Sequence, residues 1–170
     1  MSILDSDVLL ALIRSTEDDG VVEFVKQFPS RPQTTALAIA EVTAAIYAAT
    51  DPRLRSIRDR ALQDLLRGLL HRRVLPLDAD SAITLAKLAT TKNATGSYYP
   101  LGVLIQAAIS RQFMMPLVTG RAGDYQGLDL ELHPLTLDPV PAPDPGPVPV
   151  PVLGPVSAPD RRPPGTGGTG

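Results

Sequence analysis

The sequence predicts an α/β fold: a three-layer α/β/α sandwich around a mainly parallel central sheet, followed by a disordered C-terminal tail. Two observations support this prediction. Short apolar runs typical of buried strands alternate along the chain with longer segments in which apolar residues recur every three or four positions, as in helices. Parallel strands need crossover helices, which cover both faces of the sheet. Proline then becomes frequent, with 11 of the 18 prolines lying after residue 138.

The predicted elements follow from these local patterns in chain order. Strands are expected at 3–10, 33–36, 73–77, 115–119 and 128–132, and helices after 18–19, at 37–49, from 51, from 78 or 80, and at 101–112. The helix start at Asp51 is the clearest, because Asp accepts hydrogen bonds from first-turn amides and the following proline suits the first helical position. Apolar residues at helical spacing predict one buried stripe on this helix: Leu54, Ile57, Ala61, Leu65 and Leu69.

Composition predicts one globular domain, residues 1–137, with a separate tail, residues 138–170. Hydrophobic residues make up 44% of the 170 residues, which is enough for a core.

Cysteine is absent, which excludes a disulfide framework and a thiolate metal site and favours a reducing, intracellular location. The sequence has no signal segment at its start and no apolar run of the ~20 residues that a membrane helix needs. We therefore expect a soluble, cytoplasmic protein without membrane contact.

The tail has proline at every second position from 147 to 151. Because proline lacks an amide donor and has a fixed φ, neither a helix nor a central strand can form there. The last residues, 163–170, are rich in glycine and have the composition of a flexible linker. We predict a disordered or polyproline II extension. A linker-like role is the simpler interpretation, and recruitment of a partner by a proline motif is the alternative.

Three carboxylates lie in apolar surroundings. Asp5 and Asp7 interrupt the first predicted strand two residues apart, so their side chains would point to the same face of an extended chain. Glu41 lies in an apolar helical segment, residues 37–46. Burying an unpaired carboxylate is costly, so a cation, a hydrogen-bond network or a metal ion must compensate each one.

Carboxylates gathered at strand ends suit Mg²⁺ or Mn²⁺, because these hard cations prefer oxygen ligands. Such an ion can activate water and neutralise the charge on a phosphodiester. Other interpretations remain open from the residues alone. Asp5 could cap a short helix after the strand, Asp7 could be a cap or turn residue, and Glu41 could pair with an arginine.

Several segments resemble, in order and spacing, the motifs of PIN domains, especially those of VapC toxins. They are Ile3–Leu9, Thr35–Val42, Val74–Asp78, and Leu117–Thr119 with Gly123–Leu128. The first is similar to Leu-Asp-Thr-Asn-Val-Leu, and the second has the short strand and helix that carry an acidic residue in the family. The third resembles the next strand, and the last resembles a closing segment that usually reads Thr-x-Asn/Asp and then Asp-Phe-x-Gly-Leu. The similarity covers roughly residues 3–135.

The resemblance implies a Mg²⁺- or Mn²⁺-dependent endoribonuclease, the toxin of a type II toxin–antitoxin pair, with RNA as its substrate. It also implies a cognate antitoxin protein as partner and a homodimer as the assembly. In that interpretation Asp5 and Glu41 are the catalytic residues and bind the metal, and Asp7 and Asp124 are candidate further ligands.

Two positions depart from the family's pattern. The third acidic residue, which normally opens a helix as Asp-x-x-Ile-Ala-Ala, falls by spacing on Val103, which cannot bind a metal ion. The Thr-x-Asn/Asp position falls on Arg121, which brings a positive charge toward the expected cation. These departures leave enzyme activity open. The alternative function is a catalytically impaired PIN-like module that binds RNA or a partner protein without turnover, with Arg121 contacting RNA phosphate or replacing the metal electrostatically.

Arginines gather in the helix after Asp51 and just beyond it. They stand at positions 53, 55, 58, 60, 67, 72 and 73. Such a group could bind RNA phosphates electrostatically. Asp59 and Asp64 lie between them, however, and a solvated helix face is the simpler interpretation. The net charge of −2 also argues against a protein held on nucleic acid by overall charge.

Overall fold

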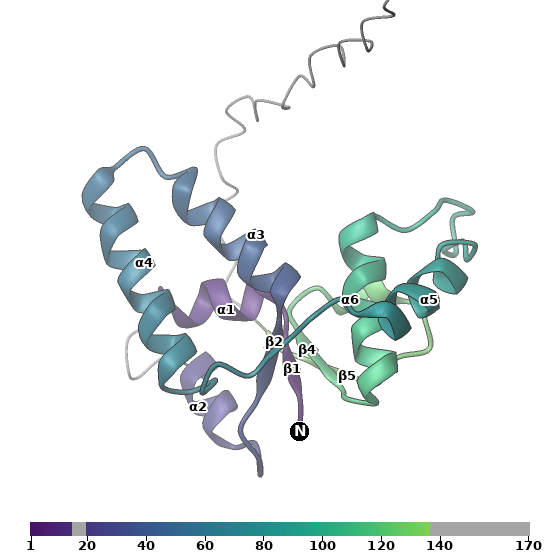
Figure 1. Ribbon diagram of the computed structural model, residues 1–170, viewed down its shortest axis with the longest axis horizontal. Helices are drawn as coiled ribbons and strands as arrows, with labels where there is room; N and C mark the ends of the chain where they lie inside the picture. The colour runs from purple at the N-terminus through teal and green to yellow at the C-terminus, as the bar shows by residue number, and fades with distance from the viewer. Residues whose placement is uncertain (15–19, 137–170) are drawn as a thin grey trace, which may run out of the picture.

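The computed structural model describes residues 1–14 and 20–136, which form a five-stranded sheet with helices on both sides (Figure 1). The strands are β1 (Ile3–Leu4), β2 (Gln33–Thr35), β3 (Val74–Leu75), β4 (Leu117–Thr119) and β5 (Leu132–Pro134). The helices are α1 (Ser6–Leu12), α2 (Gly20–Lys26), α3 (Ala36–Tyr47), α4 (Pro52–Arg67), α5 (Ala79–Leu88) and α6 (Leu101–Phe113), with a 3-10 turn η1 (Ala122–Tyr125). The predicted three-layer α/β/α fold is confirmed.

All strand pairs in the sheet are parallel, as predicted, and the strand order is β3-β2-β1-β4-β5. The central strand β1 pairs with both neighbours, since Ile3 lies opposite Gln33 of β2 and opposite Leu117 of β4. The carboxyl ends of β1, β2 and β4 therefore lie together at one edge of the sheet. In parallel sheets this is the edge where ligands usually bind.

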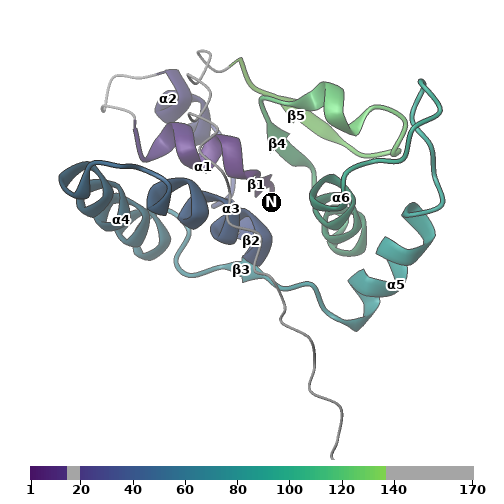
Figure 2. The same cartoon turned by 90° about the horizontal axis from the view of Figure 1, so that it is seen from above.

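Two hydrophobic clusters hold the layers together, one on each face of the sheet. Because successive strand residues point to opposite faces, Ile3 and Leu117 enter the cluster formed with α5 and α6. Leu4 and Val118 enter the cluster formed with α1, α2, α3 and α4. Figure 2 shows these two groups of helices on opposite sides of the strands.

The first strand is shorter than predicted. Residues 3–10 were expected to form one strand, but β1 ends at Leu4 and α1 begins at Ser6. Asp5 ends the strand because it is the N-cap of α1. Its backbone is extended, and the Asp5 carboxylate accepts a hydrogen bond from the Ser6 amide at 2.7 Å. A short apolar run has the same composition in a buried helix as in a buried strand, so the pattern could not separate the two.

The last strand also differs from the prediction. It was expected at residues 128–132, whereas β5 spans Leu132–Pro134. Gly127 has a φ of 87° and Asp129 a φ of 49°, and neither value is compatible with an extended strand. Leu128, between them, is buried in the α5–α6 cluster, so its apolar character reflects packing of a turn rather than a strand.

The buried stripe of α4 was predicted incorrectly at its start. Ile57 is 63% exposed and Leu54 is 37% exposed, whereas Leu62, which was not in the predicted stripe, is 2% exposed. The α3–α4 hairpin projects past α1 at the upper left of Figure 1, so only the second half of α4 packs into the core, through Leu62 and its neighbours Leu65 and Leu66.

Other sequence expectations lie outside the described residues. These are the acidic cap at 18–19 and the tail at 138–170; the described residues end just before the predicted domain boundary at 137. Within the described ranges, no helix combines the length and the apolar composition needed to cross a membrane.

The packing of α4 predicts unequal effects for two alanine substitutions on the same helix. Leu62→Ala should lower the free energy of unfolding by ~2–5 kcal/mol, because it opens a cavity in a closed cluster. Ile57→Ala should change it by less than ~0.5 kcal/mol, since that side chain is mostly in solvent. Urea denaturation followed by circular dichroism measures both values, and similar losses in the two variants would contradict the described packing.

Candidate functional site

The candidate site lies at the carboxyl edge of the sheet and is centred on Asp5. This residue follows β1 and caps α1, and it is 0% exposed. A buried ionised carboxylate is tolerated only when hydrogen bonds and counter-charge replace its lost hydration. The surrounding residues supply both.

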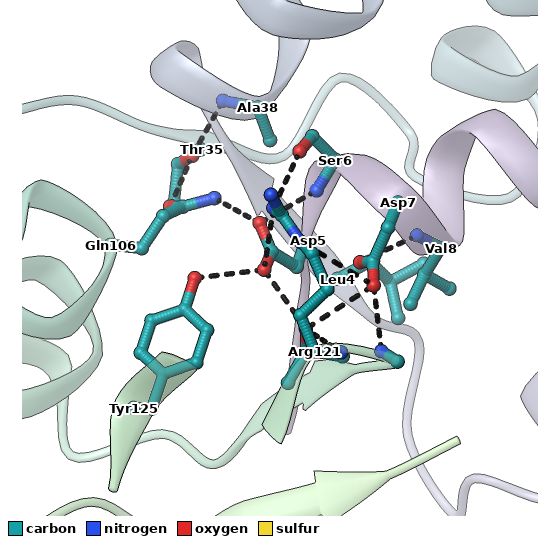
Figure 3. Close-up of polar contacts among 12 residues, drawn as sticks. Leu4, Asp5, Ser6, Asp7, Val8, Thr35, Ala38, Gln106, Arg121 and Tyr125 are labelled. Carbon is teal, nitrogen blue, oxygen red and sulfur yellow. Dashed lines mark hydrogen bonds and ion pairs between the residues drawn. The ribbon is translucent and has the colours of Figure 1, made fainter. Parts of the chain in front are cut away.

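Donors from five residues surround the Asp5 carboxylate (Figure 3). The Oδ1 atom accepts hydrogen bonds from the Ser6 amide at 2.7 Å and from Gln106 Nε2 at 2.8 Å. The Oδ2 atom accepts from the Tyr125 hydroxyl at 2.8 Å, the Thr119 hydroxyl at 3.0 Å and a terminal nitrogen of Arg121 at 3.4 Å. A carboxylate offers about four lone-pair sites, so its acceptor capacity is fully used.

A chain of buried hydrogen bonds orients Gln106 on α6. The Thr35 hydroxyl donates to Gln106 Oε1 at 2.7 Å and accepts from the Ala38 amide at 3.0 Å, which makes Thr35 the N-cap of α3. Because its oxygen is occupied by Thr35, Gln106 presents its amide nitrogen to Asp5. The caps of α1 and α3 are thus joined through one side chain of α6.

Arg121 brings a positive charge between Asp5 and Asp7. Its guanidinium lies 3.4 Å from Asp5 Oδ2 and 3.8 Å from Asp7 Oδ2, and it donates to the Ser6 hydroxyl at 3.2 Å. Asp7 also accepts hydrogen bonds from the Gly120 amide at 2.7 Å and the Val8 amide at 2.9 Å. One cation therefore serves both carboxylates, although Asp7 belongs to α1 and not to a strand as predicted.

The ionisation of the site reflects this crowding. Burial raises the pKa of Asp7, and the charge of Asp5 raises it further, against the opposing effect of Arg121. Burial alone would lower the pKa of Arg121, but Asp5 and then Asp7 outweigh it, so the net shift of its pKa is upward. Burial and the Asp5 charge also raise the pKa of Tyr125 far above its ordinary range. Arg121 is therefore charged and Tyr125 stays a neutral donor.

Glu41, on α3, lies beside the first turn of α6. A Cβ atom at Gly102 would lie 3.1 Å from Glu41 Oε1. The preceding N-cap, Pro100, forms no side-chain hydrogen bond with the free amides of α6, and a helix N-terminus stabilises a nearby negative charge. Among residues 1–14 and 20–136, Glu41 forms no hydrogen bond or ion pair, but its charge adds to the upward shift in the pKa of Arg121.

On α6, Gly102 rather than Val103 lies beside Glu41. Val103, which the spacing selected, is 9% exposed and belongs to the hydrophobic cluster under α5 and α6. Gly102 is the residue of this helix that faces Glu41. Asp124 is exposed in η1, and no hydrogen bond or ion pair joins its side chain to Asp5 or Arg121.

Sequence reasoning did not select three residues whose side chains donate to Asp5. They are Gln106, Thr119 and Tyr125. A local signal existed for Gln106, because it is the only strongly polar residue in the apolar run from 103 to 109. Thr119 and Tyr125 lie in the closing segment that resembles the family motif, but nothing local indicates that their hydroxyls point at a residue more than 100 positions earlier.

These residues do not fit Mg²⁺ or Mn²⁺. The ion needs carboxylate oxygens with free lone pairs and a negative environment. The lone pairs of Asp5 are occupied by hydrogen-bond donors, and the positive charge of Arg121 lies beside both Asp5 and Asp7. Among residues 1–14 and 20–136, no three Asp, Glu or His side chains converge in a way that could hold a metal ion.

Solved structures of toxin–antitoxin complexes share this fold. A chain of FitAB bound to the IR36 DNA fragment matches with a TM-score of 0.67 and 20% identity, over 79% of this chain and 94% of that one. A chain of VapBC2 from Rickettsia felis bound to a promoter DNA fragment has a TM-score of 0.66 and 14% identity, over 79% and 98%. A chain of VapBC-5 from Mycobacterium tuberculosis has a TM-score of 0.59 and 24% identity, over 79% and 98%.

No protein-family model matches the chain, and no curated protein matches it in sequence. Identities below 25% establish the fold and nothing finer. The chain therefore has the fold of a VapC-type PIN domain, as its motifs predicted, and its chemistry must be argued from its own residues.

Asp7 predicts a pH-dependent contribution to stability. Its pKa in the folded state lies above the ordinary value of 3.8, so the folded state holds this proton more tightly than the unfolded state does. The free energy of unfolding should therefore fall as pH rises from about 4 through the folded-state pKa. Asp7→Asn should remove that fall while keeping an oxygen for the Gly120 amide.

Urea denaturation of both proteins between pH 4 and 7 measures this effect. We expect the stability of Asp7→Asn relative to the wild type to increase with pH and then level off. A relative stability that decreases with pH would mean that the ion pair with Arg121 outweighs burial, contrary to the prediction.

Proposed function

We propose that this chain is a VapC-type PIN-fold module of the toxin–antitoxin class that acts in the cytoplasm by binding a partner, without metal-dependent cleavage of RNA. The observation that carries the proposal is the guanidinium of Arg121, which lies within 4 Å of both Asp5 and Asp7. A cation built into the protein stands where the resemblance implies Mg²⁺ or Mn²⁺.

Electrostatics support the proposal. A divalent ion placed ~4 Å from the Arg121 guanidinium would be repelled by about 8 kcal/mol at an effective dielectric constant of 20. Binding to Asp5 would also require removal of hydrogen bonds from Gln106 and Tyr125, whose buried polar groups would then lack partners. Two carboxylates and one guanidinium carry a net charge of −1, so Asp5, Asp7 and Arg121 together attract a divalent ion less than the two carboxylates alone would.

The competing hypothesis is the Mg²⁺- or Mn²⁺-dependent endoribonuclease implied by the sequence motifs, with Asp5 and Glu41 as catalytic metal ligands. It requires Arg121 to leave the site, and a third acid would favour it, although one or two carboxylates with water and substrate phosphate can hold Mg²⁺. Gly102 provides no such acid, although an aspartate there would stand next to Glu41. A role for Arg121 in holding RNA phosphate is also disfavoured, because Asp5, Asp7 and Glu41 make its surroundings net negative.

The partner proposed here is a protein of the antitoxin class. This part of the proposal rests on the similar solved structures, in which the chain of this fold occurs in FitAB and VapBC complexes. A homodimer, as implied by the resemblance, is part of the same proposal.

Metal titration tests the proposal. In isothermal calorimetry, Mn²⁺ should give no binding heat with the wild type, whereas Gly102→Asp/Arg121→Asn should bind it, because the double variant removes the guanidinium and adds an acid beside Glu41. The matched control Gly102→Asn/Arg121→Asn has nearly the same shape without the added charge and should bind much more weakly.

An RNA cleavage assay with the wild type tests the competing hypothesis of a metal-dependent nuclease. We expect no cleavage that depends on added Mg²⁺ or Mn²⁺. Cleavage that EDTA abolishes and that Glu41→Gln reduces by orders of magnitude would overturn the proposal in favour of the metal-dependent nuclease, as would tight Mn²⁺ binding by the wild type.

A further inference from the structure

A second polar surface lies at the opposite edge of the sheet from Asp5. Arg31 precedes β2, and Arg72 and Arg73 precede β3. The two strands are parallel neighbours, with Thr34 opposite Val74. The segments that enter them therefore lie side by side at the amino ends of the strands, and the Arg31 guanidinium contacts the His71 ring. The carboxyl ends and the Asp5 site are at the other edge.

The turn between α4 and β3 has an unusual backbone that presents these side chains. His71 and Arg72 have φ values of 45° and 56°, in the left-handed region that β-carbon-bearing residues rarely adopt. Backbone hydrogen bonds hold the turn, from the Arg72 amide to Leu66 at 2.7 Å and from the Arg73 amide to Leu70 at 2.8 Å. Such conformations cost energy and cluster at sites of function. Here the result is three consecutive exposed basic residues beside Arg31.

Helix α4 extends this basic surface. Arg53, Arg60 and Arg67 are spaced seven residues apart, so they share one face of the helix, and all three are exposed. With a rise of 1.5 Å per residue, neighbouring arginines in this row stand ~10 Å apart along the axis. The row ends at Arg67, and the Arg72 amide donates to the Leu66 carbonyl at 2.7 Å, so Arg72 lies beside the end of the row.

The charges of this surface have no ionic partner among the residues that the structure describes. Among residues 1–14 and 20–136, none of the arginines at 31, 53, 60, 67, 72 and 73 forms an ion pair with a carboxylate. The segment from 51 to 73 has seven arginines and three aspartates. Since the whole chain has a net charge of −2, its positive charge is concentrated here.

We infer that this surface, the α4 row with the α4–β3 turn and Arg31, binds the phosphodiester backbone of a nucleic acid. Guanidinium groups suit phosphate oxygens because they are planar and always charged. The α4–β3 turn has no Phe, Tyr or Trp for stacking bases, and arginine contacts to phosphate read no sequence, so we expect binding that is independent of sequence. The inference goes beyond the proposed function and does not depend on the state of the Asp5 site, which lies at the other edge of the sheet.

Fluorescence anisotropy with a short labelled RNA strand, in EDTA and at several NaCl concentrations, tests the inference. Arg60→Gln/Arg67→Gln should weaken binding ~10-fold or more and reduce the slope of log K against log salt by about 1.4, at ~0.7 for each lost contact to a single strand. The matched control Lys87→Gln/Arg111→Gln removes the same charge from exposed positions on α5 and α6 and should leave both quantities near the wild-type values.

The turn has its own variant, Arg31→Gln/Arg72→Asn, in which asparagine tolerates the left-handed backbone. It should weaken binding to a similar degree, with the fold checked by circular dichroism. A short duplex DNA in place of RNA distinguishes the two nucleic acids, and the same variants should weaken whichever one binds.

Three outcomes would overturn the inference. They are the absence of binding by the wild type at low salt, equal losses in Arg60→Gln/Arg67→Gln and in the control, and loss of binding in Gly102→Asn/Arg121→Asn alone. The last would place the nucleic acid at the Asp5 site. A negative result in this assay would not bear on the proposal that the Asp5 site binds no metal ion, because the assay contains EDTA and reports only nucleic-acid binding.

Discussion

The burial of one carboxylate constrains the rest of this structure. Asp5 sits at the end of the central strand with no exposure to solvent, so each of its oxygens must be satisfied from within the protein. The donors come from α1, α6, β4, η1 and Arg121 between β4 and η1, and Gln106 also accepts a hydrogen bond from Thr35, the cap of α3. These elements belong to both layers of helices. Satisfying Asp5 therefore fixes how the two layers meet at the carboxyl edge of the sheet.

The same edge explains how a fold can be kept while its chemistry changes. A metal ion and a guanidinium both neutralise carboxylates, but only the metal offers open coordination positions for water and substrate. The single positive charge of Arg121 is shared between Asp5 and Asp7, and Gly102 lets Glu41 approach the start of α6 where a further acid would repel it. The arrangement compensates Asp5 and Asp7 from within the protein, as the proposed function requires.

A parallel sheet also separates functions in space. Chain segments that leave the strands meet at one edge, and segments that enter them meet at the other. In this protein the first edge gathers buried, mutually compensated charges around Asp5, and the second gathers exposed arginines before β2 and β3. The two edges differ in environment. The charges around Asp5 are held by hydrogen bonds, whereas the arginines before β2 and β3 are exposed and form no ion pair among the described residues. A partner protein at the first edge and a nucleic acid at the second would not compete for the same residues.

Local sequence patterns were sufficient for the fold class, the parallel sheet and the capped start of α4 at Asp51, because caps, strand runs and helical periodicity are properties of neighbouring residues. They were insufficient for the split of residues 3–10 into β1 and α1, since a buried strand and a buried helix have the same apolar composition. Only the tertiary structure decided that Leu62 rather than Ile57 is buried, that Gly102 rather than Val103 faces Glu41, and that Gln106 and Tyr125 donate to Asp5. Those contacts join residues up to 120 positions apart, and no local pattern encodes which distant side chain will arrive.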